Sequence, residues 1–248
     1  MQNQMSSVRH SGSLETTEEI ENLRSQGAVY QLLARFLESE VDCGLLLILR
    51  TELQEPLQEI GIELDPWLLE GAQEEILDRL AEEYTGLLVA PGGVSPYLSV
   101  FETGTMFKEA SDRVALAYHE VGLEYRPQYS GEFPDHIGTM LAFVGYLYQA
   151  QADALQQGDL PEASRLVDLR RHFLVDQLGH WAPGWCQRAV QAALLSLYQQ
   201  VIALVGQLLW SDLAMLVDRK QLRQLQQANC REPKKLDYDA DFRKASGI

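Results

Sequence analysis

Apolar side chains recur every three or four residues along most of the chain, and this spacing is typical of amphipathic helices. Two stretches rich in glycine, proline and aromatic residues, 90–96 and 123–133, interrupt the pattern and predict loops. The expected helices cover residues 16–37, 42–53, 65–87, 105–121, 134–157, 161–178, 189–211 and 212–228. The pattern therefore predicts one all-α domain over residues 16–228, with a flexible tail at 1–15 and a loose tail at 229–248.

One expected helix, residues 189–211, contains no charged residue and is long enough to span a membrane. It also contains four glutamines, which are costly in hydrocarbon unless they are paired. Its apolar positions form two stripes, one through Val201 and one through Ile202. We therefore predict a central helix of the bundle, with neighbours on two sides, and no membrane span.

The composition supports a helical protein and makes nucleic acid an unfavourable partner. Leucine occurs 40 times, whereas valine, isoleucine and threonine together occur 30 times, so helix formers outnumber strand formers. The net charge of −16 disfavours a nucleic-acid binder, which needs clustered lysine and arginine. The same charge either attracts a basic partner or only maintains solubility.

Motifs of common enzymes and metal sites are missing from the sequence. The three cysteines are far apart, and no histidine follows a glutamate at the three-residue spacing of a di-iron bundle. There is also no phosphate-binding loop and no zinc-protease motif. We expect a protein that is not an enzyme and has no cofactor. The isolated cysteines and the polar N-terminus, which lacks a secretory signal, predict a cytoplasmic location.

Two segments stand out from the helical background. The first, residues 83–102, is a proline- and glycine-rich loop framed by aromatic residues, and simple packing on the core also explains it. The second, residues 132–138, places Asp135 and His136 at the expected start of a helix. Capping of that helix explains Asp135 without any ligand. As a catalytic pair the two are poor, because adjacent helical residues point in different directions.

In this order, the two segments resemble the TorD/DmsD/NarJ family of redox-enzyme maturation chaperones. The matching residues of the first segment are Tyr84, Leu87, Pro91, Gly92, Pro96, Tyr97, Ser99 and Val100. Those of the second are Glu132, Asp135, His136 and Gly138, and a weaker match covers residues 172–183. The chain departs from the family pattern in having Pro134 directly before Asp135, Leu88 in place of a phenylalanine, and an extra glycine, Gly93.

The resemblance implies an all-α chaperone of a molybdenum-cofactor enzyme. Such a chaperone binds the twin-arginine signal peptide of the apoenzyme catalytic subunit and holds that subunit until its cofactor is loaded. Some relatives exchange helices between subunits, so a monomer and a helix-swapped dimer both stay open, with residues 123–133 as a hinge. Weak nucleotide binding is ascribed to the family, but this sequence contains no nucleotide motif.

A receptor for a twin-arginine peptide needs carboxylates for the arginines and an aromatic groove for the apolar part. We expect the acidic mouth of this site to surround Asp135. The candidate binding residues are Asp135, His136, Pro134, Glu132, Tyr97, Ser99, Pro96, Phe101, Glu102 and Tyr84.

Two other functions are compatible with the sequence. One is an assembly adaptor for a molybdoenzyme subunit that is not exported, as for NarJ-type members, without signal-peptide binding. The other is an enzyme that uses Asp135 and His136, although the chain offers no nucleophile beside them.

Overall fold

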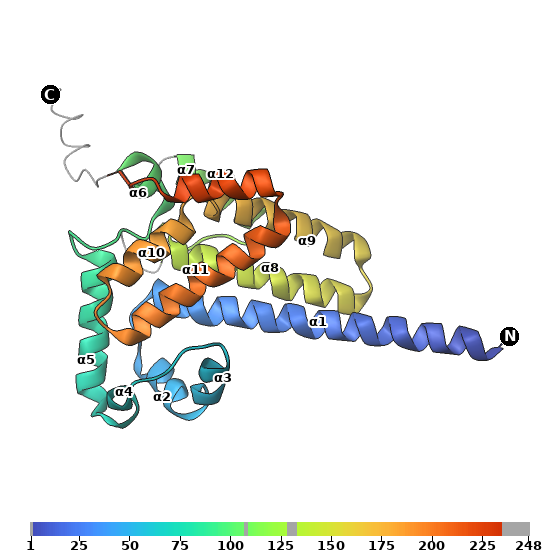
Figure 1. Cartoon of the computed structure of the whole chain (residues 1–248), viewed down its shortest axis with the longest axis horizontal. Coiled ribbons are helices and arrows are strands. Elements are labelled where there is room, and N and C mark those ends of the chain that lie inside the picture. The colour runs from blue at the N-terminus through green and yellow to red at the C-terminus, as the bar shows by residue number, and fades with distance from the viewer. Residues whose placement is uncertain (1, 107–108, 128–132, 235–248) are drawn as a thin grey trace.

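The computed structural model describes residues 2–106, 109–127 and 133–234, and this part of the chain forms helices and no strand (Figure 1). The helices of the first half are α1 (Gln2–Glu38), α2 (Cys43–Thr51), α3 (Gln54–Glu59), α4 (Pro66–Glu70), α5 (Gln73–Tyr84), the π-helical η1 (Thr85–Val89), α6 (Leu98–Thr103) and α7 (Glu109–His119). Those of the second half are α8 (Ile137–Gln157), α9 (Leu160–His172), the π-helical η2 (Phe173–Leu178), α10 (Ala182–Ala192), α11 (Ser196–Leu216) and α12 (Arg219–Asn229). The all-α prediction is confirmed.

Helices α1 and α8 form the most extensive pair of the bundle, and α9 packs on the other side of α8. Helices α1 and α8 approach so closely that their backbones are in contact. A Cβ atom added to Gly27 would lie 2.9 Å from the carbonyl oxygen of Gly145, and one added to Gly145 would lie 2.9 Å from that of Gly27. Only glycine at both positions permits this approach, because the carbonyl groups cannot move aside.

The charge-free segment forms two helices, so the single helix predicted over 189–211 is wrong. Helix α10 ends at Ala192 and α11 begins at Ser196, with extended backbone between them. The backbone N–H groups of Leu194 and Leu195 both donate to the carboxylate of Glu83 on α5, at 2.6 and 3.1 Å. A distant carboxylate thus supplies the acceptor at the start of α11, which no local pattern indicates. Helix α11 packs against α10 and α1, so it has the two neighbours expected of it.

Helices α2 to α5 form a cluster beside the C-terminal end of α1 (Figure 1). Asp42 caps α2 as expected, since its Oδ1 accepts a hydrogen bond from the N–H of Leu45 at 2.8 Å. The helix predicted over 65–87 is divided at Gly71, between α4 and α5. Arg50 holds this break by donating to the carbonyl oxygens of Leu68 and Gly71, at 2.9 and 2.7 Å.

Asp212 lies inside α11, so the expected start of the last helix at this residue is wrong. Its side chain is buried, and its Oδ2 accepts hydrogen bonds from the hydroxyl groups of Tyr30 and Tyr148, at 2.7 and 2.9 Å. The guanidinium carbon of Arg170 lies 3.8 Å from the centre of the Tyr148 ring. Burial raises the pKa of Asp212. This polar cluster joins α1, α8, α9 and α11. The last helix instead begins after Asp218, which caps it.

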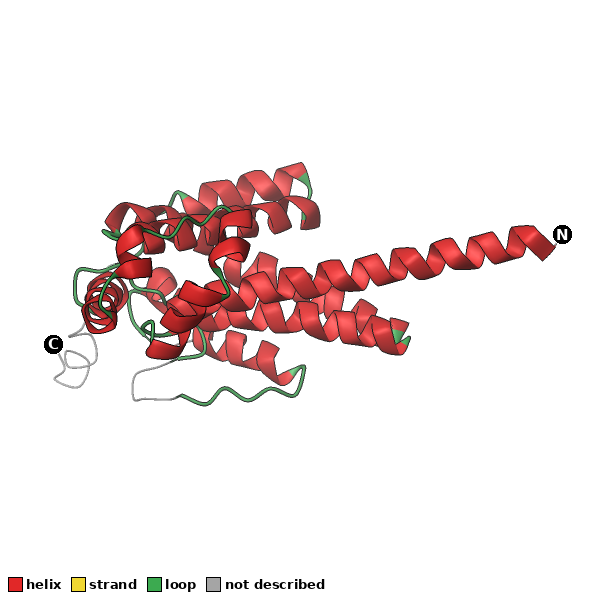
Figure 2. Ribbon diagram, turned by 90° about the horizontal axis from the view of Figure 1, so that it is seen from below, coloured by secondary structure: helices red, strands yellow, loops and turns green. Residues whose placement is uncertain are grey.

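Helix α1 begins at Gln2, whereas the capping pattern at Thr16 predicts a start there. No proline interrupts residues 2–15, so nothing in the local chemistry stops the helix from extending. Its N-terminal part projects beyond the neighbouring helices (Figure 2). The flexibility of residues 1–15 and the single domain stay predictions, and most of the expected C-terminal tail, 235–248, lies outside the described residues. No described helix combines the length and hydropathy needed to cross a membrane.

We expect Asp212→Ala to lower the free energy of unfolding by about 2–5 kcal/mol, because two buried tyrosine hydroxyls lose their acceptor. Asp212→Asn keeps an oxygen at this place and should cost clearly less. Urea denaturation of both variants measures the difference. Equal losses would show that the carboxylate charge, which both variants remove, and not an acceptor oxygen alone, stabilises this cluster.

Candidate functional site

The two segments singled out by the sequence lie side by side, although residues 103–131 separate them along the chain. The N–H of Ile137 donates to the carbonyl oxygen of Pro96 at 2.8 Å, and the N–H of Leu98 donates to that of Asp135 at 3.2 Å. Tyr97 and His136 consequently form an isolated antiparallel bridge. We call this contact between residues 96–99 and 134–138 the motif junction.

Asp135 is fully buried at the motif junction, and both of its side-chain oxygens are engaged. Oδ2 accepts a hydrogen bond from the N–H of Ser99 at 2.7 Å, and Oδ1 accepts one from the hydroxyl of Ser111 at 2.9 Å. Asp135 therefore caps α6, a helix distant in sequence, and fastens it to α7. Sequence reasoning missed Ser111, because a serine inside a regular helix gives no local signal of such a contact.

His136 caps α8, the role that the sequence suggests for Asp135. Its Nδ1 accepts a hydrogen bond from the N–H of Gly138 at 3.1 Å, so the ring proton lies on Nε2. The ring packs edge-on against Tyr97, with centroids 5.1 Å apart. Burial lowers the pKa of His136 to about 4, which keeps the imidazole neutral at physiological pH.

Gly138 and Tyr84 attach the motif junction to the end of α1. A Cβ atom on Gly138 would lie 2.8 Å from the backbone nitrogen of Glu38, so only glycine lets α8 start this close to α1. The hydroxyl of Tyr84 donates to the carbonyl oxygens of Leu37 and Glu38, at 3.3 and 3.0 Å. Tyr84 and Gly138 thus both contact the last turn of α1.

Phe101 and Glu102 lie at the partly exposed side of this region. Glu102 accepts an ion pair from Arg113 at 2.8 Å and lies 3.3 Å from Nε2 of His180. The Phe101 ring packs against Trp181, with centroids 6.0 Å apart. Both residues therefore hold α6 against its neighbours while remaining partly accessible.

The motif junction is an interior joint, and the acidic mouth expected around Asp135 is not present in the described structure. Pro96, Tyr97, Ser99, Asp135, His136 and Tyr84 are buried, Pro134, Phe101 and Glu102 are partly exposed, and Glu132 lies outside the described residues. The Ser99 hydroxyl is buried without a hydrogen-bond partner in the described part of the chain. In this conformation Asp135 cannot pair with an external arginine, since it is covered and its oxygens are occupied.

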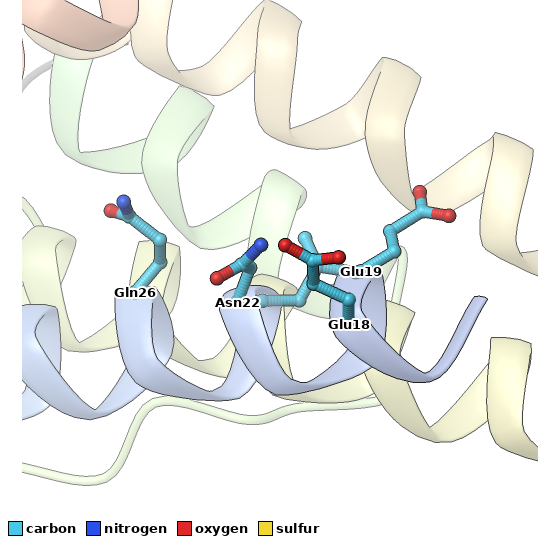
Figure 3. A pocket seen from close by; sticks show the side chains of 5 residues that line it. Glu18, Glu19, Asn22 and Gln26 are labelled. Atoms are coloured by element: carbon cyan, nitrogen blue, oxygen red, sulfur yellow. The ribbon is translucent and has the colours of Figure 1, made fainter. Parts of the chain in front are cut away.

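Three cavities open on the surface of the described residues without Asp135 or His136 in their lining. One of about 330 Å³ lies over α1 and is lined by residues of that helix alone, including Glu18, Asn22 and Gln26 (Figure 3). One of about 260 Å³ lies between α7, α8 and the 123–126 loop, with aromatic walls. One of about 460 Å³ lies beside α5 and η1. The described residues contain no group of three metal-ligating side chains.

Negative charge is concentrated away from the motif junction. The segment 43–84, which spans α2 to α5, carries 11 of the 36 acidic residues and only two basic ones, Arg50 and Arg79. Its net charge is therefore −9 of the total −16. Neither composition nor total charge reveals this segregation. Once the residues are placed on the fold, the most acidic part of the molecule is the α2–α5 cluster.

Comparison with known proteins assigns the chain to a family. The family model described as nitrate reductase delta subunit matches residues 49–187, which is more than half of the chain. The chain belongs to this family. The matched range contains the whole motif junction, from Pro96 to Gly138, and the family assignment confirms the resemblance to redox-enzyme maturation chaperones noted in the sequence.

A relative in this family is the chlorate reductase assembly chaperone protein of Ideonella dechloratans. It is 29% identical over 147 residues, which cover 58% of the present chain and 74% of that protein.

Asp135→Ala should destabilise the fold by about 2–5 kcal/mol, because the Ser99 N–H and the Ser111 hydroxyl lose their acceptor in the interior. Asp135→Asn should cost much less, since the amide oxygen can accept from Ser99 while the amide N–H₂ donates to the Ser111 hydroxyl. Urea denaturation separates the two variants. An unchanged free energy of unfolding in Asp135→Ala would refute the role of this residue in holding α6 and α7 together.

The pKa of His136 predicts a pH dependence of stability. The histidine binds a proton below about pH 6.5 in the unfolded chain, but only below about pH 4 in the folded one. Stability from this residue is therefore lost as the pH falls from about 6.5 to about 4, by at most about 3 kcal/mol.

The variant His136→Asn tests this, because asparagine keeps a side-chain acceptor for the helix cap but does not titrate. Its free energy of unfolding should fall less steeply than that of the wild type between pH 7 and pH 4. Parallel curves for the two proteins would contradict the assignment.

Proposed function

We propose that the chain is an assembly chaperone for the catalytic subunit of a molybdenum-cofactor oxidoreductase. The observation that carries this proposal is family membership, supported by a relative whose name describes assembly of chlorate reductase. The structure is compatible with it, because the family-type motif residues meet in one joint that fixes the relative positions of α1, α6, α7 and α8. A preformed, rigid surface binds a client at low entropic cost.

The finer proposal is that the chaperone works in the cytoplasm and binds the twin-arginine signal peptide of its client. It holds the apoenzyme until the cofactor is inserted, before export. The net charge of −16 supports this, because it attracts a basic peptide. An enzymatic role for Asp135 and His136 has little support, since both are buried and the imidazole is neutral and engaged in capping.

A second candidate is an adaptor that binds the mature part of a molybdoenzyme subunit without recognising a signal peptide. The description of the matching family as a nitrate reductase delta subunit favours it, since the resemblance to NarJ-type members implies a client subunit that is not exported.

Affinity purification of the tagged chain from its native cell, followed by mass spectrometry, tests the proposal. We expect a molybdoenzyme catalytic subunit in its cofactor-free form. Calorimetry with the first 40 residues of that subunit then separates the two candidates. Micromolar or tighter binding that weakens with salt and with replacement of its arginines by glutamine supports signal-peptide recognition.

Binding of the mature apoenzyme alone would favour the adaptor. Absence of any molybdoenzyme from the purified material, with the chaperone at its native level, would contradict both candidates.

A further inference from the structure

The cavity of about 460 Å³ beside α5 is a groove whose floor and walls come from three parts of the chain. The end of α5 and η1 provide Glu82, Gly86 and Leu87, and the 92–93 loop closes one side. The link between α10 and α11 provides Ala192, Leu194 and Leu195. We call it the α5 groove.

An apolar side chain is exposed at the α5 groove on backbone that is held in place. Leu194, in the wall, is 85% exposed. The Glu83 carboxylate fixes the backbone of Leu194 and Leu195, and the N–H of Val94 donates to the carbonyl oxygen of Leu87 at 2.7 Å. Exposing Leu194 beside the apolar wall formed by Leu87, Ala192 and Leu195 is unfavourable in water, which points to a surface that another molecule covers.

The approach to the α5 groove is acidic. Glu75, Asp78 and Glu82 follow one another at spacings of three and four residues, so they share an exposed face of α5 that leads to Gly86. Within residues 2–106, 109–127 and 133–234, none of the three forms an ion pair. Arg79, which also lines the α5 groove, is the basic residue on this helix, and its guanidinium carbon lies 4.4 Å from the centre of the Trp67 ring.

We propose that the α5 groove and the acidic face of α5 together form the docking surface for a cationic amphipathic segment of the client polypeptide. An apolar side chain of that segment enters the groove between Leu87 and Leu194, and its arginine or lysine groups lie along Glu75, Asp78 and Glu82. Charge complementarity selects this occupant, because the surrounding α2–α5 cluster carries most of the negative charge of the molecule. This inference rests on the proposed function, and it places recognition on the outer surface, away from the motif junction.

The apolar part of the proposal is tested at Gly86. A Cβ atom added there meets nothing within 4 Å, and its backbone is not in the left-handed region, so a side chain fits without strain. Gly86→Trp fills the α5 groove, whereas Gly86→Ala leaves it open and is the matched control. The probe is a 20-residue synthetic peptide with two consecutive arginines followed by a leucine-rich run, and calorimetry measures its dissociation constant.

The charged part is tested by the triple variant Glu75→Gln, Asp78→Asn, Glu82→Gln. Its control is Glu18→Gln, Glu19→Gln, Glu21→Gln, which removes the same charge from exposed positions on α1. We expect the α5 variant to weaken peptide binding about tenfold at low salt, as three exposed ion pairs contribute together, and the control to change it less than twofold. The difference should shrink in 0.5 M salt.

The outcomes separate this inference from the proposed function. If Gly86→Trp and the α5 triple variant weaken binding at least fivefold while Gly86→Ala and the α1 triple variant do not, the docking surface is supported. If the wild type binds the peptide and all four variants bind equally well, the docking surface is overturned and the proposed function stands. If the wild type binds neither this peptide nor its native client, the proposed function fails, and the docking surface with it. Circular dichroism and urea denaturation verify that each variant is folded.

Discussion

The contact between the backbones of α1 and α8 is the constraint on which the rest of this structure depends. Gly27 and Gly145 face each other across the contact, and Gly138 meets the backbone of Glu38 at its end. Because glycine carries no Cβ atom, the two helices pack closer than side chains would allow. This places the start of α8 against the end of α1, and the segment before α8 then meets the loop that leads to α6.

The motif junction follows from this placement. Asp135 uses both carboxylate oxygens to cap α6 and to fasten α7, while His136 caps α8 with its neutral ring. The side-chain hydrogen-bonding atoms Oδ1 and Oδ2 of Asp135 and Nδ1 of His136 are therefore occupied by bonds that hold the helices together. A buried acceptor with two donors contributes more than a surface one, since losing it leaves unpaired groups in the interior. Asp135 and His136, which resemble binding residues in the sequence, thus hold helices together in the interior. We infer that a client contacts the outer surfaces of these helices instead.

Buried carboxylates stabilise the fold, whereas the exposed carboxylates gather where we propose that a partner binds. Carboxylates needed inside the bundle, Asp135, Asp212 and Glu83, are paired with N–H or O–H donors. The excess lies on the outside of the α2–α5 cluster, beside a groove with exposed leucine. Net charge alone is compatible with mere solubility, but its concentration next to apolar surface is what a basic amphipathic partner requires.

The sequence by itself determined the helical class, the two non-helical interruptions, the cap at Asp42 and the family, because helical periodicity, turn residues and motif spacing are local properties. It also indicated the two segments that meet in the motif junction. It could not show that α10 and α11 separate where Glu83 supplies an acceptor, or that Asp212 belongs to a buried cluster rather than a helix cap, since the partners come from distant parts of the chain. The same limit applies to Asp135: whether a carboxylate at a helix start faces solvent or the interior depends on which helices pack over it, and only the tertiary structure decided that.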